Sequence, residues 1–263
     1  IRLEEAPARV PGPGEAVVRV RACGVCGSDL HSFQNRWPQP PVVPGHEVAG
    51  TVEAVGEGVS NVKVGDAVAL EPFVSCGECR PCRSGQYNVC TRHEFISWHR
   101  DGGFADQMVV PARCLLALPE GPAQQYGALV EPLAVAVHGL RRAPLMGGDT
   151  VVVLGAGTIG LLAAAAARAL GAGRVLLTAK YPHQAAAAEQ MGIRDVIRLG
   201  EGNPAEAILE RAGEDAVDVV LESVGGAQAI DLAIKVARRG GVISLVGSYV
   251  MPPRTPLSEV IGR

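Results

Sequence analysis

The sequence contains no long apolar run and no cluster of basic residues. Its longest apolar stretch covers residues 161–167, which is far too short to span a bilayer. The net charge is −3, and no run of Lys or Arg forms the basic stripe typical of proteins that bind nucleic acid or membrane surfaces. We therefore expect neither nucleic acid nor a membrane as a partner.

No signal peptide is recognisable at the start of the chain. The chain opens on Ile1 rather than Met, so we expect that its natural start is missing. The seven cysteines lie in a chain too long for a small secreted disulfide protein. We expect a cytoplasmic protein whose cysteines bind metal in a reducing compartment.

Four of the cysteines are closely spaced, in the order Cys76-x-x-Cys79-x-x-Cys82-x7-Cys90. Four thiolates that close one tetrahedral shell are typical of structural zinc. An iron–sulfur cluster also uses C-x2-C-x2-C spacing, but here the last gap is seven residues and no proline follows Cys90. The spacing therefore predicts a structural zinc lobe over about residues 76–90.

The two halves of the chain differ in pattern. The first half has short apolar segments at 17–21, 48–55 and 67–70 between glycine turns, which predict strands. After residue 144, strands predicted at 150–154, 174–178, 195–199, 217–222 and 241–246 alternate with helices that begin near Thr158, His183, Pro204 and Ala227. This alternation indicates a parallel α/β sheet. We expect a catalytic domain over 1–144 and a dinucleotide-binding domain over 145–263.

A doubly wound dinucleotide domain has six strands in the order 3-2-1-4-5-6, and only five are predicted before the chain stops at Arg263. We therefore expect the chain to be truncated at both ends. The turn after its first strand reads Gly155-Ala-Gly157-Thr158-Ile159-Gly160. This pattern between a strand and a helix predicts a dinucleotide site, because the glycines allow a tight turn, close approach of the pyrophosphate and close helix packing.

The end of the second predicted α/β strand bears on cofactor choice. An NAD site usually has an acid there for the ribose hydroxyls, but this chain reads Ala179-Lys180-Tyr-Pro-His183. Lys180 and His183 predict a preference for NADP over NAD; the alternative is a solvated lysine with NAD held by other contacts. Backbone groups that follow the fourth and fifth strands are expected to face the nicotinamide, and they belong to Val224, Gly225, Val246 and Gly247.

A second group of metal-binding residue types lies in the first half of the chain. A catalytic zinc takes three protein ligands and keeps one open position. Cys26 offers a thiolate and His46 an imidazole, and either Glu47 or Glu131 can complete the set. Each of these short segments is weak evidence of a zinc site on its own. Their occurrence together with the cysteine lobe and the glycine turn is very unlikely by chance.

With these motifs the chain resembles the zinc-containing medium-chain dehydrogenases, and within them the branch of sorbitol, threonine and related dehydrogenases. The resemblance covers essentially the whole chain and rests on Cys26-Gly-Ser28-Asp29-Leu-His31, Gly45-His46-Glu47, the four-cysteine lobe, Glu131-Pro132 and Gly155-x-Gly157-x-x-Gly160. It implies a GroES-like, mostly β catalytic domain followed by a Rossmann domain. It also implies two zinc ions, one catalytic and one structural, and a homodimer or homotetramer.

The resemblance also implies roles for the residues near the catalytic zinc. Ser28 is expected to take the proton of the substrate hydroxyl and His31 to pass it towards water, while Asp29 orients His46. Phe33 and Trp37 are candidates for the substrate pocket. We expect hydride transfer between NAD(P) and a secondary alcohol of a polyol, sugar or cyclitol. The alternatives are a simple-alcohol or threonine dehydrogenase, or a catalytically silent nucleotide-binding relative.

Overall fold

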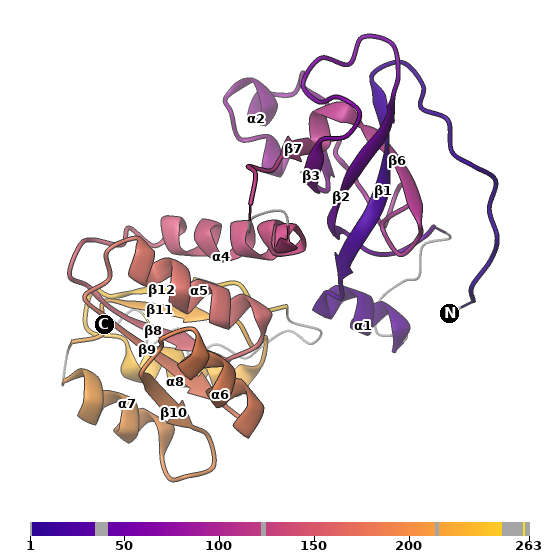
Figure 1. The fold of residues 1–263 in the computed structure, drawn as a ribbon. Coiled ribbons are helices and arrows are strands. Elements are labelled where there is room, and N and C mark those ends of the chain that lie inside the picture. The colour runs from indigo at the N-terminus through magenta and orange to yellow at the C-terminus, as the bar shows by residue number, and fades with distance from the viewer. Residues whose placement is uncertain (1, 35–41, 122–124, 214–215, 249–259, 261–263) are drawn as a thin grey trace. The chain divides into compact units, whose positions relative to one another are not determined.

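The computed structural model describes residues 2–34, 42–121, 125–213, 216–248 and 260. The chain divides into two compact units, Ile1–Glu131 and Pro132–Arg263. The dividing point lies near the start of helix α4 (Val130–Arg142), whereas the sequence placed the domain boundary at residue 144, after this helix. Most of α4 thus belongs to the second unit (Figure 1).

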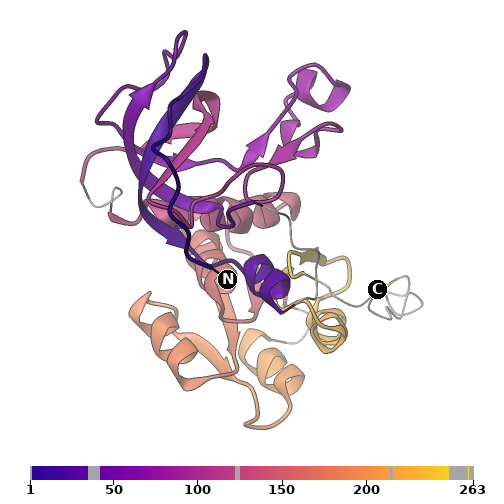
Figure 2. The ribbon, with the colours of Figure 1, turned by 90° about the vertical axis from the view of Figure 1, so that its right-hand side faces the viewer.

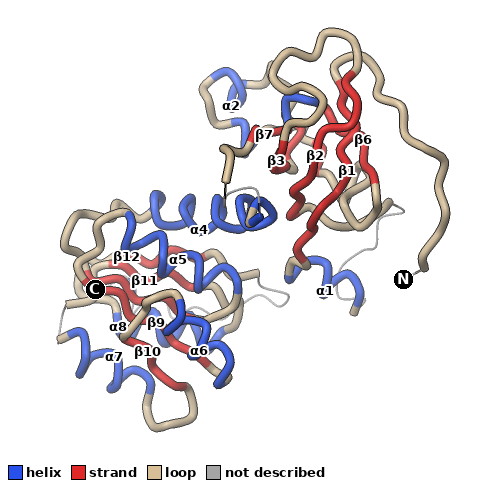
Figure 3. Tube along the Cα trace, viewed as in Figure 1, coloured by secondary structure: helices blue, strands red, loops and turns tan. Residues whose placement is uncertain are grey.

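The first unit is built on an antiparallel sheet of five strands in the order β6-β1-β2-β3-β7. Its strands are β1 (Glu15–Gly24), β2 (Glu47–Val55), β3 (Ala67–Leu70), β6 (Gln107–Pro111) and β7 (Leu115–Ala117). One face of the sheet packs into a core rich in valine, which suits a pleated and half-buried surface. The three strands predicted in this half of the chain lie within β1, β2 and β3, and Figure 3 shows the strands of this unit in red with only short helices beside them.

Short elements complete the first unit. Strands β4 (Phe73–Val74) and β5 (Glu94–Phe95) pair with each other, and the chain between them carries the four clustered cysteines together with α2 (Arg80–Arg83) and the 3-10 turn η1 (Tyr87–Val89). Helix α1 (Gly27–Phe33) follows β1. The 3-10 turns η2 (Ala112–Cys114) and η3 (Gly127–Leu129) precede β7 and α4 respectively.

The second unit contains a parallel sheet of five strands in the order β10-β9-β8-β11-β12. Numbered along this half of the chain, the order is 3-2-1-4-5, as the sequence predicted for the strands present. The strands are β8 (Thr150–Leu154), β9 (Arg174–Ala179), β10 (Asp195–Arg198), β11 (Val219–Glu222) and β12 (Val242–Leu245). The helices between them are α5 (Thr158–Ala169), α6 (Pro182–Gln190), α7 (Pro204–Ala212) and α8 (Ala227–Val236), seen from the side in Figure 2.

Both faces of this sheet are buried. Along β8, Val151 and Val153 join the core beneath α4, α5 and α6, while Val152 and Leu154 join the core beneath α7 and α8. Successive side chains of a strand point to opposite faces, so burial of both faces requires the uninterrupted apolar run that the sequence shows. In the described part of the chain, no helix has the length and apolar character needed to cross a bilayer.

Candidate functional site

The four cysteines of the lobe over residues 76–90 converge on one point. Their Sγ atoms all lie within 4.8 Å of one another, with Cys79–Cys82 at 3.3 Å, Cys76–Cys90 at 3.5 Å and Cys79–Cys90 at 3.7 Å. Thiolates about 2.3 Å from a tetrahedral zinc would be about 3.8 Å apart. The residues therefore fit a zinc ion, and the structure contains no disulfide among the seven cysteines.

Donors around the lobe favour thiolates over thiols. The backbone N–H groups of Cys76 and Arg92 each donate to Cys90 Sγ at 3.4 Å, and the Arg92 guanidinium lies 3.6 Å from Cys76 Sγ. Backbone N–H groups, first that of Cys82, lower the pKa of the Cys79 thiol to about 6. Desolvation, and then hydrogen bonds with the neighbouring sulfurs, raise the pKa of Cys82 to about 12, so a cation bound by all four sulfurs would favour its thiolate form.

A second group brings together Cys26, His46 and Glu47, whose ligand atoms also lie within 4.8 Å of one another. The pairing of β1 with β2 produces this group, because it sets Gly24 opposite Glu47. A Cβ added to Gly24 would lie 2.0 Å from Glu47 Oε2, so the glycine leaves room for the Glu47 carboxylate in its present position. Cys26 follows two residues later, as the residue before α1.

This second group places acidic side chains in a desolvated environment. Burial raises the pKa of Cys26 and of Glu47. Burial, and then the nearby Glu47, raise the pKa of Glu131 to about 7. Glu131 lies in the first turn of α4 but outside the group formed by the other three residues. A divalent cation would favour the ionised forms of these acids, so a thiolate, an imidazole and a carboxylate here fit a catalytic zinc.

His46 is 4% exposed, and burial lowers its pKa. Its Nδ1 lies 3.2 Å from Ser97 Oγ, and its ring meets Phe95 edge-on with ring centroids 5.2 Å apart. The sequence motifs gave no signal for Ser97, which is 51 residues away along the chain. Ser97 has a φ of 83°, a conformation that costs a residue other than glycine about 1–3 kcal/mol.

Asp29 lies beside both metal-binding motifs. Its Oδ2 accepts the backbone N–H of Cys26 at 2.9 Å, so it fixes the turn that presents the Cys26 sulfur. Ser97 makes a hydrogen bond with His46 Nδ1 at 3.2 Å. The charge of Asp29 also acts on His46, because it opposes the lowering of the His46 pKa by burial.

Helix α1 carries the two residues expected to move the proton. The Ser28 hydroxyl and backbone N–H bond to the Cys26 sulfur, and these bonds act against the burial that raises the pKa of Cys26. His31 is half-buried and stands three positions after Ser28, a spacing that puts both residues on one side of a helix. Phe33 is 61% exposed at the end of α1, and Trp37 lies outside the described residues.

The glycine turn lies between β8 and α5. Gly155 has a φ of +97°, and its N–H donates to Thr178 Oγ1 at 2.9 Å. A Cβ on Gly160 would lie 1.8 Å from the carbonyl oxygen of Gly155, whereas a Cβ on Gly157 would meet no atom within 4 Å. Gly157 and Thr158 are exposed, and Ile159 follows in the first turn of α5. The N-terminus of α5 therefore presents free N–H groups to open space, where an anion can bind.

The loops that follow β11 and β12 pack backbone against backbone. The buried Glu222 carboxylate accepts the N–H groups of Val224 at 2.5 Å and Gly225 at 2.9 Å. A Cβ on Gly247 would lie 2.3 Å from the nitrogen of Gly225, and Val246 bonds through its N–H to the carbonyl of Glu222 at 2.8 Å. These loops stand at the carboxyl ends of the strands, where open α/β sheets bind ligands.

The end of β9 carries a cation rather than an acid. Ala179 is fully buried, and Lys180 follows it with Nζ 5.3 Å from the centroid of the Tyr181 ring. The Tyr181 and His183 rings are stacked, with centroids 5.6 Å apart and planes 7° apart. This cluster is open to solvent and positively charged, so it can receive an anionic group.

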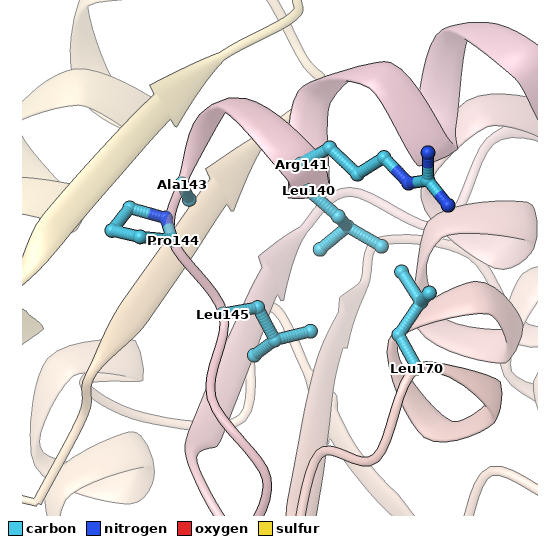
Figure 4. Close-up of a pocket in the computed structure, with 6 residues that line it drawn as sticks. All are labelled: Leu140, Arg141, Ala143, Pro144, Leu145 and Leu170. Atoms are coloured by element: carbon cyan, nitrogen blue, oxygen red, sulfur yellow. The ribbon is translucent and has the colours of Figure 1, made fainter.

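A separate hollow of about 260 Å³ lies at the other end of the second unit. The side chains of Leu140, Leu145 and Leu170 point towards one another there (Figure 4), and Arg141, Ala143 and Pro144 complete the lining. Leu170 is the C-cap of α5, so the hollow is separated from the glycine turn by the length of that helix, about 18 Å for 12 residues. It is therefore not the nucleotide site.

Two family models match the chain. The alcohol dehydrogenase GroES-like domain matches residues 12–120, and the zinc-binding dehydrogenase domain matches residues 158–262. Curated relatives include the sorbitol dehydrogenase of Bacillus subtilis, 36% identical over 94% of this chain and 72% of the relative. The L-idonate 5-dehydrogenase of Vitis vinifera is 37% identical over 96% of this chain and 72% of the relative. The L-threonine 3-dehydrogenase of Pyrococcus horikoshii is 36% identical over 94% of this chain and 72% of the relative.

Solved structures share the fold at similar identity. A protein of Sinorhizobium meliloti 1021 described as a zinc-binding dehydrogenase bound to NADP is 33% identical, with a TM-score of 0.89 over 97% of this chain and 76% of that one. A protein of Escherichia coli CFT073 described as a short chain alcohol dehydrogenase complexed with NADH is 32% identical, with a TM-score of 0.87. The match covers 98% of this chain and 76% of that one.

Two glycine-to-alanine variants test the roles of the glycine turn. Gly157→Ala adds a methyl group to open space, so we expect wild-type thermal stability but a dinucleotide affinity at least about tenfold lower, because the methyl occupies the path of the pyrophosphate. Gly160→Ala drives a methyl group into backbone and should cost about 1–3 kcal/mol of unfolding free energy. Thermal denaturation and fluorescence titration with NADPH and NADH measure both quantities. Wild-type affinity in Gly157→Ala would contradict this view of the turn.

Proposed function

The chain belongs to the zinc-binding alcohol dehydrogenase family, and we propose that it transfers hydride between a secondary alcohol of a polyol, sugar or cyclitol and NAD(P). The observation that carries the proposal is the convergence of Cys26, His46 and Glu47 in a buried place beside the helix of Ser28 and His31. The sorbitol and L-idonate dehydrogenases among the relatives support the substrate class.

We assign the catalytic zinc to Cys26, His46 and Glu47, and a structural zinc to the four-cysteine lobe. Glu47 is preferred over Glu131 as the carboxylate ligand because its oxygen lies within the same 4.8 Å group as the sulfur and the imidazole. Glu131 then acts as the nearby second acid and remains the alternative ligand. Zinc bound there supplies Lewis-acid polarisation of the substrate oxygen, and the nicotinamide cofactor accepts the hydride.

The protein's own residues handle the proton. The Ser28 hydroxyl adjoins the Cys26 sulfur, so an alcohol oxygen held at this group lies within reach of it. His31 stands one helical turn further along α1, and an imidazole is a common proton shuttle, which suits a group that passes a proton to water. His46 and Glu47 are 4% and 7% exposed, which limits the access of water to these two metal-binding side chains.

Two other functions compete with this proposal. A threonine dehydrogenase is supported by relatives of the same identity as the sorbitol enzymes, and a simple-alcohol dehydrogenase uses the same chemistry. A catalytically silent nucleotide-binding relative would have no need to keep a metal-binding thiol, an imidazole and the adjacent hydroxyl, yet Cys26, His46 and Ser28 are all present. We also propose a homodimer or homotetramer, by analogy with the family.

A direct test follows reduced-nicotinamide absorbance with polyols, sugars, threonine and simple alcohols, using NAD and NADP separately. We expect turnover on a polyol or sugar that disappears on treatment with a chelator and returns with zinc, because the substrate oxygen needs the metal. Turnover that survives complete removal of zinc would overturn the mechanism. Turnover with threonine alone would show that the substrate is threonine and not a polyol, sugar or cyclitol.

The proton path predicts the effect of Ser28→Ala. We expect kcat to fall by about 100-fold or more, in the range of general acid–base contributions, with the zinc content unchanged. Ser32→Ala on the same helix should leave kcat near the wild-type value. If Ser28→Ala keeps wild-type kcat while it retains zinc, Ser28 is not part of the proton path.

The cation after β9 predicts a preference for NADP. The 2′-phosphate adds a charged partner for Lys180 and His183, so Lys180→Ala should lower kcat/KM for NADP by about tenfold and change that for NAD little. Lys63→Ala, on the exposed surface of the first unit, is the control. Comparable wild-type kcat/KM values for NAD and NADP would contradict the preference.

A further inference from the structure

Ser97 lies in a tight turn directly after β5. The N–H of Ser97 donates to the carbonyl of Arg100 at 2.8 Å, and the N–H of His99 donates to the carbonyl of Phe95 at 2.8 Å. Ile96 is fully buried and anchors the turn in the core of the first unit. The turn therefore has little freedom, and it holds the Ser97 hydroxyl against the imidazole of His46.

The contact with Ser97 bears on which nitrogen of His46 binds a metal. Nδ1 lies 3.2 Å from Ser97 Oγ and is engaged by this contact, and in the tautomer with the proton on Nδ1 it donates to the hydroxyl oxygen. The lone pair for a metal is then on Nε2. A metal-bound histidine commonly donates its other N–H in this way, and the partner fixes both the tautomer and the ring orientation.

The backbone of Ser97 is unfavourable for a serine. Among the described residues it is the one non-glycine residue with positive φ, at 83°. Glycine adopts this conformation freely and would shape the same turn without strain. The side chain must therefore contribute something that glycine lacks, and with 3% exposure its described polar neighbour is His46.

We propose that Ser97 is a positioning residue of the metal centre, whose hydroxyl accepts the Nδ1–H of His46 and directs Nε2 towards the zinc. Phe95 limits the tilt of the ring from another side, with a centroid distance of 5.2 Å and an interplanar angle of 66°. The inference rests on the proposed function, because it concerns the metal that Cys26, His46 and Glu47 would bind.

The test is Ser97→Gly in the full chain. It removes the hydroxyl and relieves the backbone, so stability and metal affinity should change in opposite directions. We expect the melting temperature of the metal-free protein to be equal to or above that of the wild type. We expect zinc at the catalytic site to bind roughly 10- to 100-fold more weakly, in the range found for loss of such partners. Competition with a chromophoric chelator measures the affinity, with the four-cysteine lobe as the internal reference.

Two further variants separate the hydroxyl from the backbone. Ser97→Ala removes the hydroxyl but keeps a Cβ at positive φ, so it should weaken the catalytic zinc as Ser97→Gly does. Gly58→Ser places a serine at a φ of +80° on the exposed surface, with no atom within 4 Å of its Cβ. It should lower the melting temperature and leave both zinc affinities unchanged. The visible bands of the Co(II)-substituted protein should shift in both Ser97 variants and not in Gly58→Ser.

The outcomes distinguish this inference from the proposed function. If the wild type binds zinc at Cys26 and His46 and turns over substrate, but both Ser97 variants bind it within twofold of the wild type, the positioning role is wrong and the dehydrogenase proposal stands. If the wild type binds no zinc at this group, both fail. Equal weakening at both zinc sites would also overturn the role, because it would indicate general destabilisation.

Discussion

The antiparallel pairing of β1 with β2 is the interaction on which the proposed metal centre depends. It sets Gly24 opposite Glu47, and so joins two short motifs that are about twenty residues apart in the sequence. The ladder fixes the backbone, and the valine-rich core beneath it holds the register, because a slip of one residue would turn every buried side chain to the wrong face. The sulfur, the imidazole and the carboxylate converge as a consequence of this register.

The two cysteine-containing sites differ in the surroundings that set the pKa values of their acidic groups. The four-cysteine lobe surrounds its sulfurs with backbone N–H groups and the Arg92 guanidinium, so thiolates are favoured by donors near the surface. The group around Cys26 is more deeply buried, and burial raises the pKa values of Cys26, Glu47 and Glu131. Such a group gains most from a cation, which suits a centre where a metal must also polarise a substrate.

Much of the architecture could be predicted from the sequence, because it follows from periodicity. The five parallel strands have near-continuous apolar runs, and the glycine turn marks the first crossover. Motifs also singled out Cys26, His46 and the four cysteines of the lobe, and the structure brings the ligand atoms of each group within 4.8 Å of one another. Strands β4, β5 and β7 have only two or three residues each, too few for a periodic signal. Local pattern could not reveal Ser97 either, because its contact with His46 depends on a turn 51 residues away. The sequence also does not show that the Asp29 carboxylate accepts the backbone N–H of Cys26, because this contact depends on the fold of the turn before α1.

The choice between Glu47 and Glu131 illustrates the same point. Both are acids in recognised motifs, and only the three-dimensional positions of their oxygens separate them. The most direct test of the metal centre is the zinc content per chain of purified wild type and Cys26→Ser, with Cys23→Ser as control because Cys23 lies outside the metal-binding group. We predict two zinc ions per chain in the wild type and in Cys23→Ser, and one in Cys26→Ser. An unchanged zinc content in Cys26→Ser would contradict a metal centre at this group.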